Sequence, residues 1–346
     1  MTAPLTASPE EVDARFHRIV DELTRRGFIS GGLSAAALLG LAACTTDETG
    51  DGRSAADPAA STAWTYTDDL GREIDLPSTP ARIAVLSDGP AATLWAAGLH
   101  VVAAPLADGN RPFLTGAGVP GTGVTALGAE NRMNVEKLAA ARPDLIIDTV
   151  DAGTLRATSK QPQIAKIAPV LGLDGTGPDV DAIIDRAHRI VAALGIAAAD
   201  GQAHADYRAA ETRLTKALAA KPGLRAMFCF ANGDNGLDIM VADKWPFMQT
   251  LAGLGLRLEE AGTGGNGYFT EVSWENVPTL PVDLVVYTGL GLPGTNPGWQ
   301  AMPAVKAGQY LDSGVGWYAY YYANYVTMLD TLTAAIAKAD TEVGPR

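Results

Sequence analysis

The chain has few of the side chains that cross-link a fold or bind transition metals. It holds only two cysteines, Cys44 and Cys229. Cys229 lies in the apolar run 226–230 and has no second cysteine left to pair with, because Cys44 has a different predicted role. It is therefore predicted to be a small buried hydrophobic residue, without a disulfide framework. The four histidines form no HxH or HxxxH pair, so we expect no metal ion bound directly by the protein.

Long apolar runs and basic residues are also scarce. The apolar run 31–43 is about as long as a signal-peptide core, and no segment reaches the ~20 apolar residues that span a bilayer. There are 26 basic against 39 acidic residues, which gives a formal net charge of −13 at pH 7. Nucleic acids bind to basic surfaces, so a nucleic-acid partner is not expected.

The N-terminal segment carries two export motifs in the expected order. Arg25 and Arg26 stand in Thr-Arg-Arg-Gly-Phe-Ile, which resembles a twin-arginine signal, and Leu-Ala-Ala-Cys ending at Cys44 resembles a lipobox. Bacteria attach diacylglycerol to a lipobox cysteine and cleave before it, and two acyl chains suffice for stable anchoring. We expect residues 1–43 to be a signal peptide and the mature protein to be lipid-anchored outside the cytoplasmic membrane. The alternative is a buried helix preceded by a basic pair.

The rest of the chain divides into a tether and two lobes. Residues 44–63 are rich in Thr, Ser, Ala, Asp and Gly without apolar periodicity, which predicts a disordered tether. Short apolar runs then alternate with helical stretches, as in an α/β fold with mainly parallel sheets. The expected strands are 82–86, 101–104, 145–147, 226–230, 239–241 and 284–287. We predict an N-terminal lobe over 64–178 and a C-terminal lobe over 196–346.

A long amphipathic segment separates the two halves. Apolar residues recur at three- and four-residue spacing between Val180 and Leu194, which predicts a helix over 179–195. Asp179 or Asp181 is the candidate N-cap, and Gly195 marks its end. The helix is either an ordinary packing helix or a rigid strut that joins two lobes.

The two halves also contain a repeated segment. Residues 134–147 align without gaps to residues 273–286, and both read as a cap, an acidic residue, a short helix, an aspartate and a buried strand. The acidic residues are Glu136 and Glu275. A glutamate in a first helical turn is favourable with the helix dipole, so each has a purely structural interpretation too. The repeat predicts two lobes of related design.

Several segments together resemble the class III periplasmic-binding proteins, the substrate-binding lipoproteins of ferric-siderophore and cobalamin ABC importers. The opening Asp-Leu-Gly-Arg of 69–72 and Pro-Ala-Arg-Ile of 80–83 match the family's start. The repeated segments match its Asn-Leu-Glu and Val-Ser-x-Glu patterns, and 299–308 matches its late Trp…Pro-Ala-Val-Lys-Ala-Gly motif. The resemblance covers roughly residues 66–335.

The resemblance implies two Rossmann-like α/β lobes joined by a single long helix, with a ligand cleft between them. It implies a monomer that delivers its ligand to an ABC permease dimer, onto which Glu136 and Glu275 dock. The ligand would be a ferric siderophore whose iron is already fully coordinated, so no cofactor and no direct metal ligand is expected. Haem or cobalamin is the alternative ligand within the same fold.

Aromatic and basic side chains are the candidates for the cleft. The sequence offers the aromatic residues Trp245, Tyr268, Phe269, Trp317 and Tyr318 and the basic residues Arg111 and Arg132. Aromatic walls suit large, partly apolar chelates. Both arginines can equally be solvated surface charges. Triply anionic catecholates need several basic residues, and no basic cluster is present, which favours a hydroxamate or mixed-type siderophore.

An exported dinucleotide-dependent oxidoreductase is the competing interpretation. Two stretches match GxGxxG, at Gly262/Gly264/Gly267 and Gly289/Gly291/Gly294. Pro293 and Pro297 interrupt the helix that should follow the second stretch, which argues against a pyrophosphate site there. No GxSxG motif is present and no histidine is placed as a base. We therefore expect a binding protein without catalytic residues.

Overall fold

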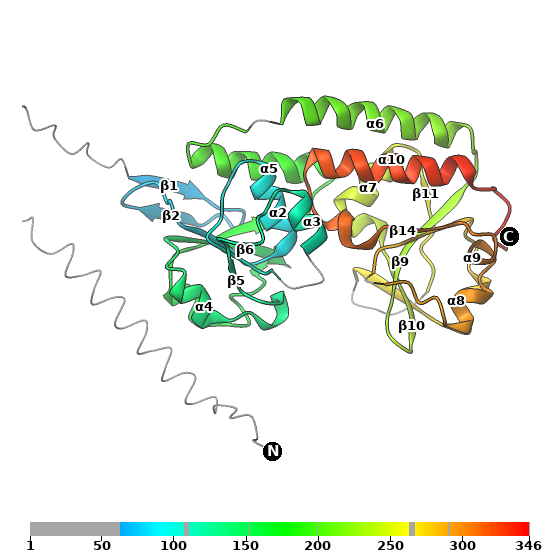
Figure 1. Cartoon of the computed structure of the whole chain (residues 1–346), viewed down its shortest axis with the longest axis horizontal. Helices are drawn as coiled ribbons and strands as arrows, with labels where there is room; N and C mark the ends of the chain where they lie inside the picture. Colours follow the sequence, from blue (N-terminus) through cyan, green and yellow to red (C-terminus); the bar gives the residue numbers. More distant parts are fainter. Residues whose placement is uncertain are drawn as a thin grey trace, which may run out of the picture.

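Two six-stranded β-sheets, one in each half of the molecule, organise the chain (Figure 1). The computed structural model describes residues 63–106, 111–151, 153–198, 200–262, 267–289 and 291–345. Arg25, Arg26 and Cys44 lie outside the described residues, with the predicted signal peptide and nearly all of the predicted tether. Among the residues that the structure describes, no helix is both long and apolar enough to cross a membrane.

The N-terminal lobe is built on six strands that are nearly all parallel. They are β3 (Ile83–Val85), β4 (Ala103–Ala104), β5 (Thr125–Ala126), β6 (Leu145–Asp151), β7 (Thr154–Leu155) and β8 (Val170–Asp174). Their order is β5-β4-β3-β6-β7, with β8 also on β6, and β7 alone runs antiparallel. The helical elements are α2 (Asp88–Ala96), α3 (Arg111–Gly116), α4 (Val135–Ala140), η2 (Glu130–Arg132) and η3 (Pro162–Lys166). The hairpin β1 (Trp64–Thr67) and β2 (Glu73–Leu76) precedes them.

The C-terminal lobe holds the second six-stranded sheet. Its strands are β9 (Arg225–Ala231), β10 (Gly236–Met240), β11 (Arg257–Leu258), β12 (Phe269–Ser273), β13 (Leu284–Tyr287) and β14 (Tyr310–Asp312). The order is β12-β10-β9-β13-β14 with β11 also on β9, and β10 runs antiparallel to both its neighbours. Its helical elements are α7 (Pro246–Gly253), α8 (Pro297–Ala301), α9 (Pro303–Lys306), α10 (Tyr322–Lys338), η4 (Ala242–Lys244), η5 (Val277–Thr279) and η6 (Gly314–Tyr318).

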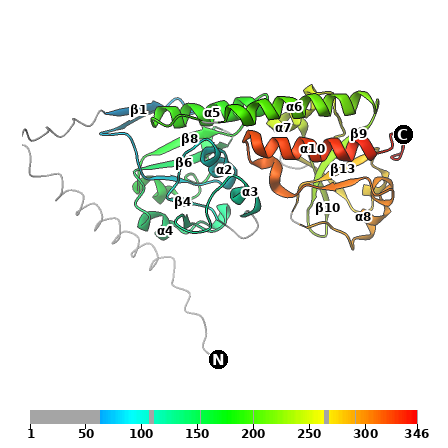
Figure 2. The same ribbon diagram turned by 45° about the horizontal axis from the view of Figure 1, so that its top comes forward.

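Helix α5 (Val180–Ala193) belongs to the cores of both lobes. The Asp179 side chain caps it by accepting a hydrogen bond from the Ala182 N–H at 2.8 Å, and Gly195 follows with a φ of +77°. Its first half packs into the C-terminal core and its second half into the N-terminal core. Helix α6 (Gly201–Ala219) then runs beside α10 along the C-terminal lobe (Figure 2). The α5 contacts agree with the strut interpretation.

The repeated segments share their aspartates but not their helices. Asp144 accepts hydrogen bonds from the N–H groups of Ala81 and Arg82, just before β3, and Asp283 accepts one from the Arg225 N–H at the start of β9. In the first repeat Asn134 caps α4. The expected α-helix of the second repeat is only the 3-10 helix η5, because Pro278 lies inside it and cannot donate a helical hydrogen bond.

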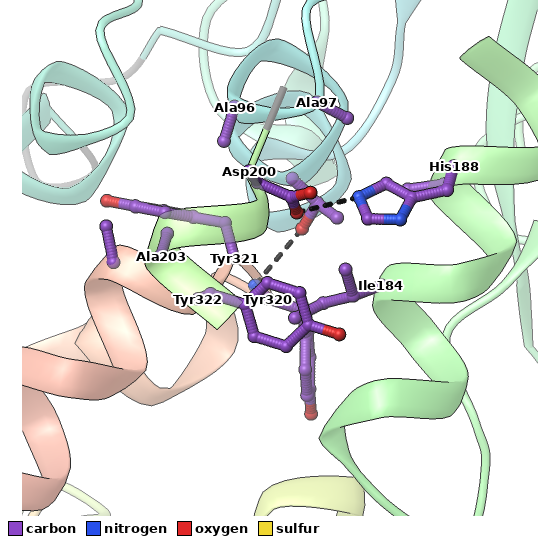
Figure 3. A pocket seen from close by; sticks show the side chains of 12 residues that line it. Ala96, Ala97, Ile184, His188, Asp200, Ala203, Tyr320, Tyr321 and Tyr322 are labelled. Carbon is purple, nitrogen blue, oxygen red and sulfur yellow. Dashed lines mark hydrogen bonds and ion pairs between the residues drawn. The ribbon is translucent and has the colours of Figure 1, made fainter. Parts of the chain in front are cut away.

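The chain contacts the N-terminal lobe again where η6 leads into α10. Ala319 and Tyr321 pack in the N-terminal core, whereas Tyr320 and Tyr322 pack in the C-terminal core. A small hollow of about 70 Å³ lies at this contact and is lined by His188 and Asp200, whose Nε2 and Oδ2 atoms are 2.9 Å apart (Figure 3). This hollow is too small for an organic ligand.

Candidate functional site

A cavity of about 810 Å³ lies between the two lobes. The carboxyl ends of β6, β8, β9 and β13 all open onto it. In parallel α/β sheets, ligands bind at the carboxyl ends of the strands, where the connections leave a crevice. A volume of this size falls within the range of small-molecule sites, roughly 300–1,000 Å³. This cavity is therefore the candidate binding site.

Aromatic rings form the wall of the cavity that belongs to the C-terminal lobe. Trp245 is at their centre, with ring centroids 5.7 Å from Tyr268, 5.5 Å from Phe269 and 5.5 Å from Tyr318. Phe230 meets Phe269 edge to face at 4.9 Å. Trp245 is held in place because its indole N–H donates to the Tyr268 carbonyl at 3.3 Å. We call these five residues the aromatic wall.

Two phenols beside the aromatic wall stay protonated at neutral pH. Burial raises the pKa of Tyr318 above its ordinary value, although the hydrogen bond to Thr288 at 3.3 Å opposes the rise. Burial also raises the pKa of Tyr287, whose hydroxyl oxygen accepts a hydrogen bond from the Ala231 N–H at 3.2 Å. Tyr318 donates its proton to Thr288 Oγ1, whereas Tyr287 only accepts in its bond to Ala231 and can donate its proton to a ligand oxygen.

The wall formed by the N-terminal lobe is polar and carries charge. Asp88 begins α2, and its backbone N–H donates to Glu130 Oε1 at 2.7 Å. Arg156 lies 3.3 Å from Glu130 Oε2 and 4.0 Å from Asp151 Oδ2. Burial and the neighbouring Glu130 carboxylate raise the pKa of Asp88 to about 8, while Arg156 opposes the shift. We call Asp88, Glu130, Asp151 and Arg156 the acidic wall.

The two walls meet at two points across the cavity. The Tyr268 hydroxyl donates to Asp151 Oδ1 at 3.3 Å, which links the aromatic wall to the acidic wall. Gly89, in the first turn of α2, lies against the Tyr318 backbone, and a Cβ at this position would be 2.4 Å from the Tyr318 carbonyl oxygen. A glycine is required here because any side chain would push the lobes apart.

Four of the predicted cleft aromatics lie together around the cavity, namely Trp245, Tyr268, Phe269 and Tyr318. The prediction for Trp317 is wrong. This residue is fully buried in the C-terminal core, where it stacks on Phe247 at 5.3 Å and its carbonyl accepts a hydrogen bond from Tyr325 at 2.7 Å. Successive residues of the 3-10 helix η6 point about 120° apart, so Tyr318 faces the cavity while Trp317 faces the core.

The predicted arginines are not part of the cavity wall that the structure describes. Arg132 ends η2 as an exposed residue and does not line the cavity. The Arg111 backbone begins α3, and its side chain is not among those that the structure describes. The basic group in the acidic wall is Arg156, which sequence reasoning missed.

Sequence reasoning also missed several other lining residues, namely Asp88, Glu130, Asp151, Phe230 and Tyr287. Four of them stand at or just after the ends of β3, β6, β9 and β13. The rule that ligands bind at the carboxyl ends of parallel strands could have found these four from the strand predictions. Glu130 follows no strand directly, and no such signal identifies it.

Glu136 and Glu275 lie outside the cavity, one on each lobe. Glu136 is half-buried in the first turn of α4, and Glu275 is exposed in the turn between β12 and η5. Figure 1 places α4 and α8 on the side of the molecule opposite α6 and α10, and η5 packs against α8. The elements next to the two glutamates, α4 in one lobe and η5 with α8 in the other, therefore lie on the side of the molecule opposite α6 and α10.

The second glycine-rich motif does not open onto a helix. Gly289 and Gly291 follow β13 and line the cavity, but the next helix, α8, begins only at Pro297 and has five residues. A dinucleotide fingerprint needs a helix N-terminus at the glycines to bind the pyrophosphate. Of the first motif, residues 263–266 lie outside the described residues.

In the described part of the chain, no three His, Cys, Asp or Glu side chains are grouped to hold a metal ion.

Two α/β lobes that are joined by one long helix and enclose a ligand-sized cavity define a solute-binding protein. The chain belongs to the periplasmic binding protein family, whose model matches residues 83–312. The family resemblance and the two-lobed α/β fold inferred from the sequence are thereby confirmed. Proteins of this family bind solutes and are not enzymes.

The chain is similar to several known proteins. DesE, a ferric-siderophore receptor protein from Streptomyces coelicolor, superposes with a TM-score of 0.71 at 28% identity, over 81% of this chain and 100% of DesE. The petrobactin-binding protein YclQ of Bacillus subtilis has the same fold, with a TM-score of 0.59 at 17% identity over 80% and 99% of the two chains. YhfQ of Bacillus subtilis, described as an ABC transporter substrate-binding lipoprotein, is 34% identical over 132 residues. That match spans 37% of this chain and only 39% of YhfQ.

Proposed function

We propose that this protein captures a ferric siderophore in the cavity between its lobes and delivers it to an ABC importer. The observation that carries the proposal is the cavity of about 810 Å³ with an aromatic wall, in a chain that matches a ferric-siderophore receptor over 100% of that receptor's length. A chelate arrives with its iron already coordinated. The protein then has to supply only apolar surface and a few hydrogen-bond donors.

The composition of the cavity favours a hydroxamate or mixed-type siderophore over a catecholate. A ferric ion bound by three catecholates carries a net negative charge and calls for several free basic groups. Among the described lining residues, the basic ones are Arg156 and Lys244, and both already face carboxylates. Three singly charged hydroxamates leave the ferric complex neutral, which suits an aromatic wall with phenol donors.

The predicted anchor and docking residues fit the same role. Lipidation at Cys44, after export directed by Arg25 and Arg26, would hold the protein at the outer face of the cytoplasmic membrane. A monomer tethered there would present Glu136 and Glu275 to a permease dimer. Paired carboxylates on two lobes suit a two-subunit basic surface, because each can accept charge-assisted hydrogen bonds from arginine.

A ligand screen tests the proposal directly. We expect ferric hydroxamates to quench the intrinsic fluorescence of the purified protein, since Trp245 lines the cavity. Trp245→Phe should remove most of the quenching, whereas Trp95→Phe, at a residue that does not line the cavity, should retain it. Haem and cobalamin belong in the same screen. Binding of either, with no response to any ferric siderophore, would overturn the proposal in favour of the alternative ligand.

A further inference from the structure

The lining of the cavity has a surplus of negative charge. Its described carboxylates are more numerous than its cations, with Asp88, Glu130, Asp151 and Asp174 against Arg156 and Lys244. Carboxylates are expensive to bury without partners, so a surplus in a partly enclosed site points to a ligand that compensates it. The aromatic wall contributes no charge, and the surplus is thus concentrated on the N-terminal lobe.

The two cations compensate the surplus only in part, because Arg156 is shared by two of the carboxylates and Lys244 pairs with a carboxylate outside the lining. Arg156 lies between Glu130 and Asp151, at 3.3 Å and 4.0 Å. The Lys244 ammonium lies 3.0 Å from the carboxylate of Asp243. Asp174 faces Arg186 at 3.9 Å. These pairings leave Asp88 without an ion pair among the described residues.

Asp88 and Glu130 form a close pair that retains a proton near neutral pH. The Asp88 N–H donates to Glu130 Oε1 at 2.7 Å, and Asp88 Oδ1 accepts from the Gly89 N–H at 2.7 Å. The start of α2 favours a negative charge, yet burial and Glu130 raise the pKa of Asp88 to about 8. Arg156 is the cation that faces the pair, and the hydroxyls of Ser87 and Thr149 lie nearby on the cavity wall. A cation from the ligand can take the place of the retained proton.

We propose that the ligand carries an ammonium arm that binds between Asp88 and Glu130 while its neutral ferric hydroxamate core rests on the aromatic wall. The inference rests on the proposed function and narrows it to chelates with zero or positive net charge. An ammonium donates three hydrogen bonds and matches two carboxylates that face one cavity. An anionic chelate would instead meet like charge on the N-terminal side.

A matched pair of ligands tests the inference at neutral pH. The first is a linear ferric trihydroxamate that ends in a primary amine, and the second is the same chelate with this amine acetylated. We expect isothermal titration calorimetry to show about tenfold or more weaker binding of the acetylated chelate, which is the size of one charge-assisted hydrogen bond. Equal affinities would overturn the ammonium assignment but leave the proposed function standing. Absence of binding by both would overturn the hydroxamate proposal itself.

Variants that remove the charge of Asp88 or Glu130 test whether these two carboxylates cause the preference for the amine-bearing chelate. Asp88→Asn and Glu130→Gln should each reduce the preference for the amine-bearing chelate to about threefold or less, while the affinity for the acetylated chelate stays within about twofold. Retained affinity for the acetylated chelate shows that a variant is folded. Asp75→Asn, an exposed carboxylate on β2, is the control and should keep the full preference. An unchanged preference in both cavity variants would overturn the assignment.

Discussion

The two lobes share a frame and differ in the walls that face the ligand. In each lobe an aspartate before a central strand accepts hydrogen bonds from the start of the neighbouring strand, Asp144 in one and Asp283 in the other. The N-terminal lobe presents the acidic wall from α2 and η2, whereas the C-terminal lobe presents the aromatic wall around Trp245. Recognition therefore lies in the segments that follow the strands, while the repeat maintains the frame.

The largest expected effect concerns the one feature that both lobes carry outside the cavity, a glutamate in the repeated segment. We predict that Glu136→Ala combined with Glu275→Ala abolishes siderophore uptake in cells and leaves ligand affinity unchanged, because neither residue lines the cavity. Uptake of a radioactive ferric chelate and calorimetry on the purified variant measure the two quantities. Glu73→Ala, an exposed glutamate on β2, is the control. Weakened ligand binding in the double variant would place these carboxylates in the fold or the site instead.

The second-largest expected effect distinguishes the role of the aromatic wall from that of the acidic wall in ligand binding. Trp245→Ala removes the ring that contacts Tyr268, Phe269 and Tyr318, so we expect ligand affinity to fall by about 30-fold or more, as for central aromatic residues of binding sites. The loss should be similar for an amine-bearing and an acetylated chelate, because the two share the ferric core that we propose to rest on the aromatic wall. Trp95→Ala serves as the control in calorimetry. A loss confined to one of the two chelates would contradict the division of roles between the walls.

The frame was largely predictable from the sequence, because its signals are local. The apolar periodicity, the Asp179 cap and Gly195 defined α5, and each of the six predicted strands overlaps an observed one, namely β3, β4, β6, β9, β10 and β13. The acidic wall was not predictable, since Asp88 and Glu130 are 42 positions apart and meet only because of the order of strands in the sheet. Trp317 was misassigned because neighbouring residues of a 3-10 helix can face a core and a cavity.

The second repeat shows a further limit of sequence comparison. Its alignment with the first repeat is free of gaps, yet the α-helix that Asn134 caps in one lobe is replaced by the short η5 in the other. A proline at the third position after the glutamate is enough to change the hydrogen bonding of that turn. The aspartate and the strand that follow are retained, because they are fixed by the sheet.

The smallest expected effect concerns stability rather than binding. The folded-state pKa of Asp88 is raised to about 8, so the folded protein binds more protons than the unfolded chain between about pH 4 and pH 8. The contribution of Asp88 to stability is thus present at low pH and is lost as the pH rises through this window. Asp88→Asn cannot ionise and keeps an oxygen for the Gly89 N–H.

We therefore expect Asp88→Asn to melt about 2–4 °C above the wild type at pH 9 and close to it at pH 4, when both are measured without ligand by differential scanning calorimetry. Asp75→Asn should show no such trend, because its side chain is exposed. A variant that is equally destabilised at every pH would contradict the raised pKa. A variant that is more stable yet selects less strongly for the amine-bearing chelate would show that the acidic wall lowers stability and is present because it serves recognition. The aromatic wall should show no comparable conflict, because its rings pack on one another within the C-terminal lobe and are also the proposed contact surface for the ligand.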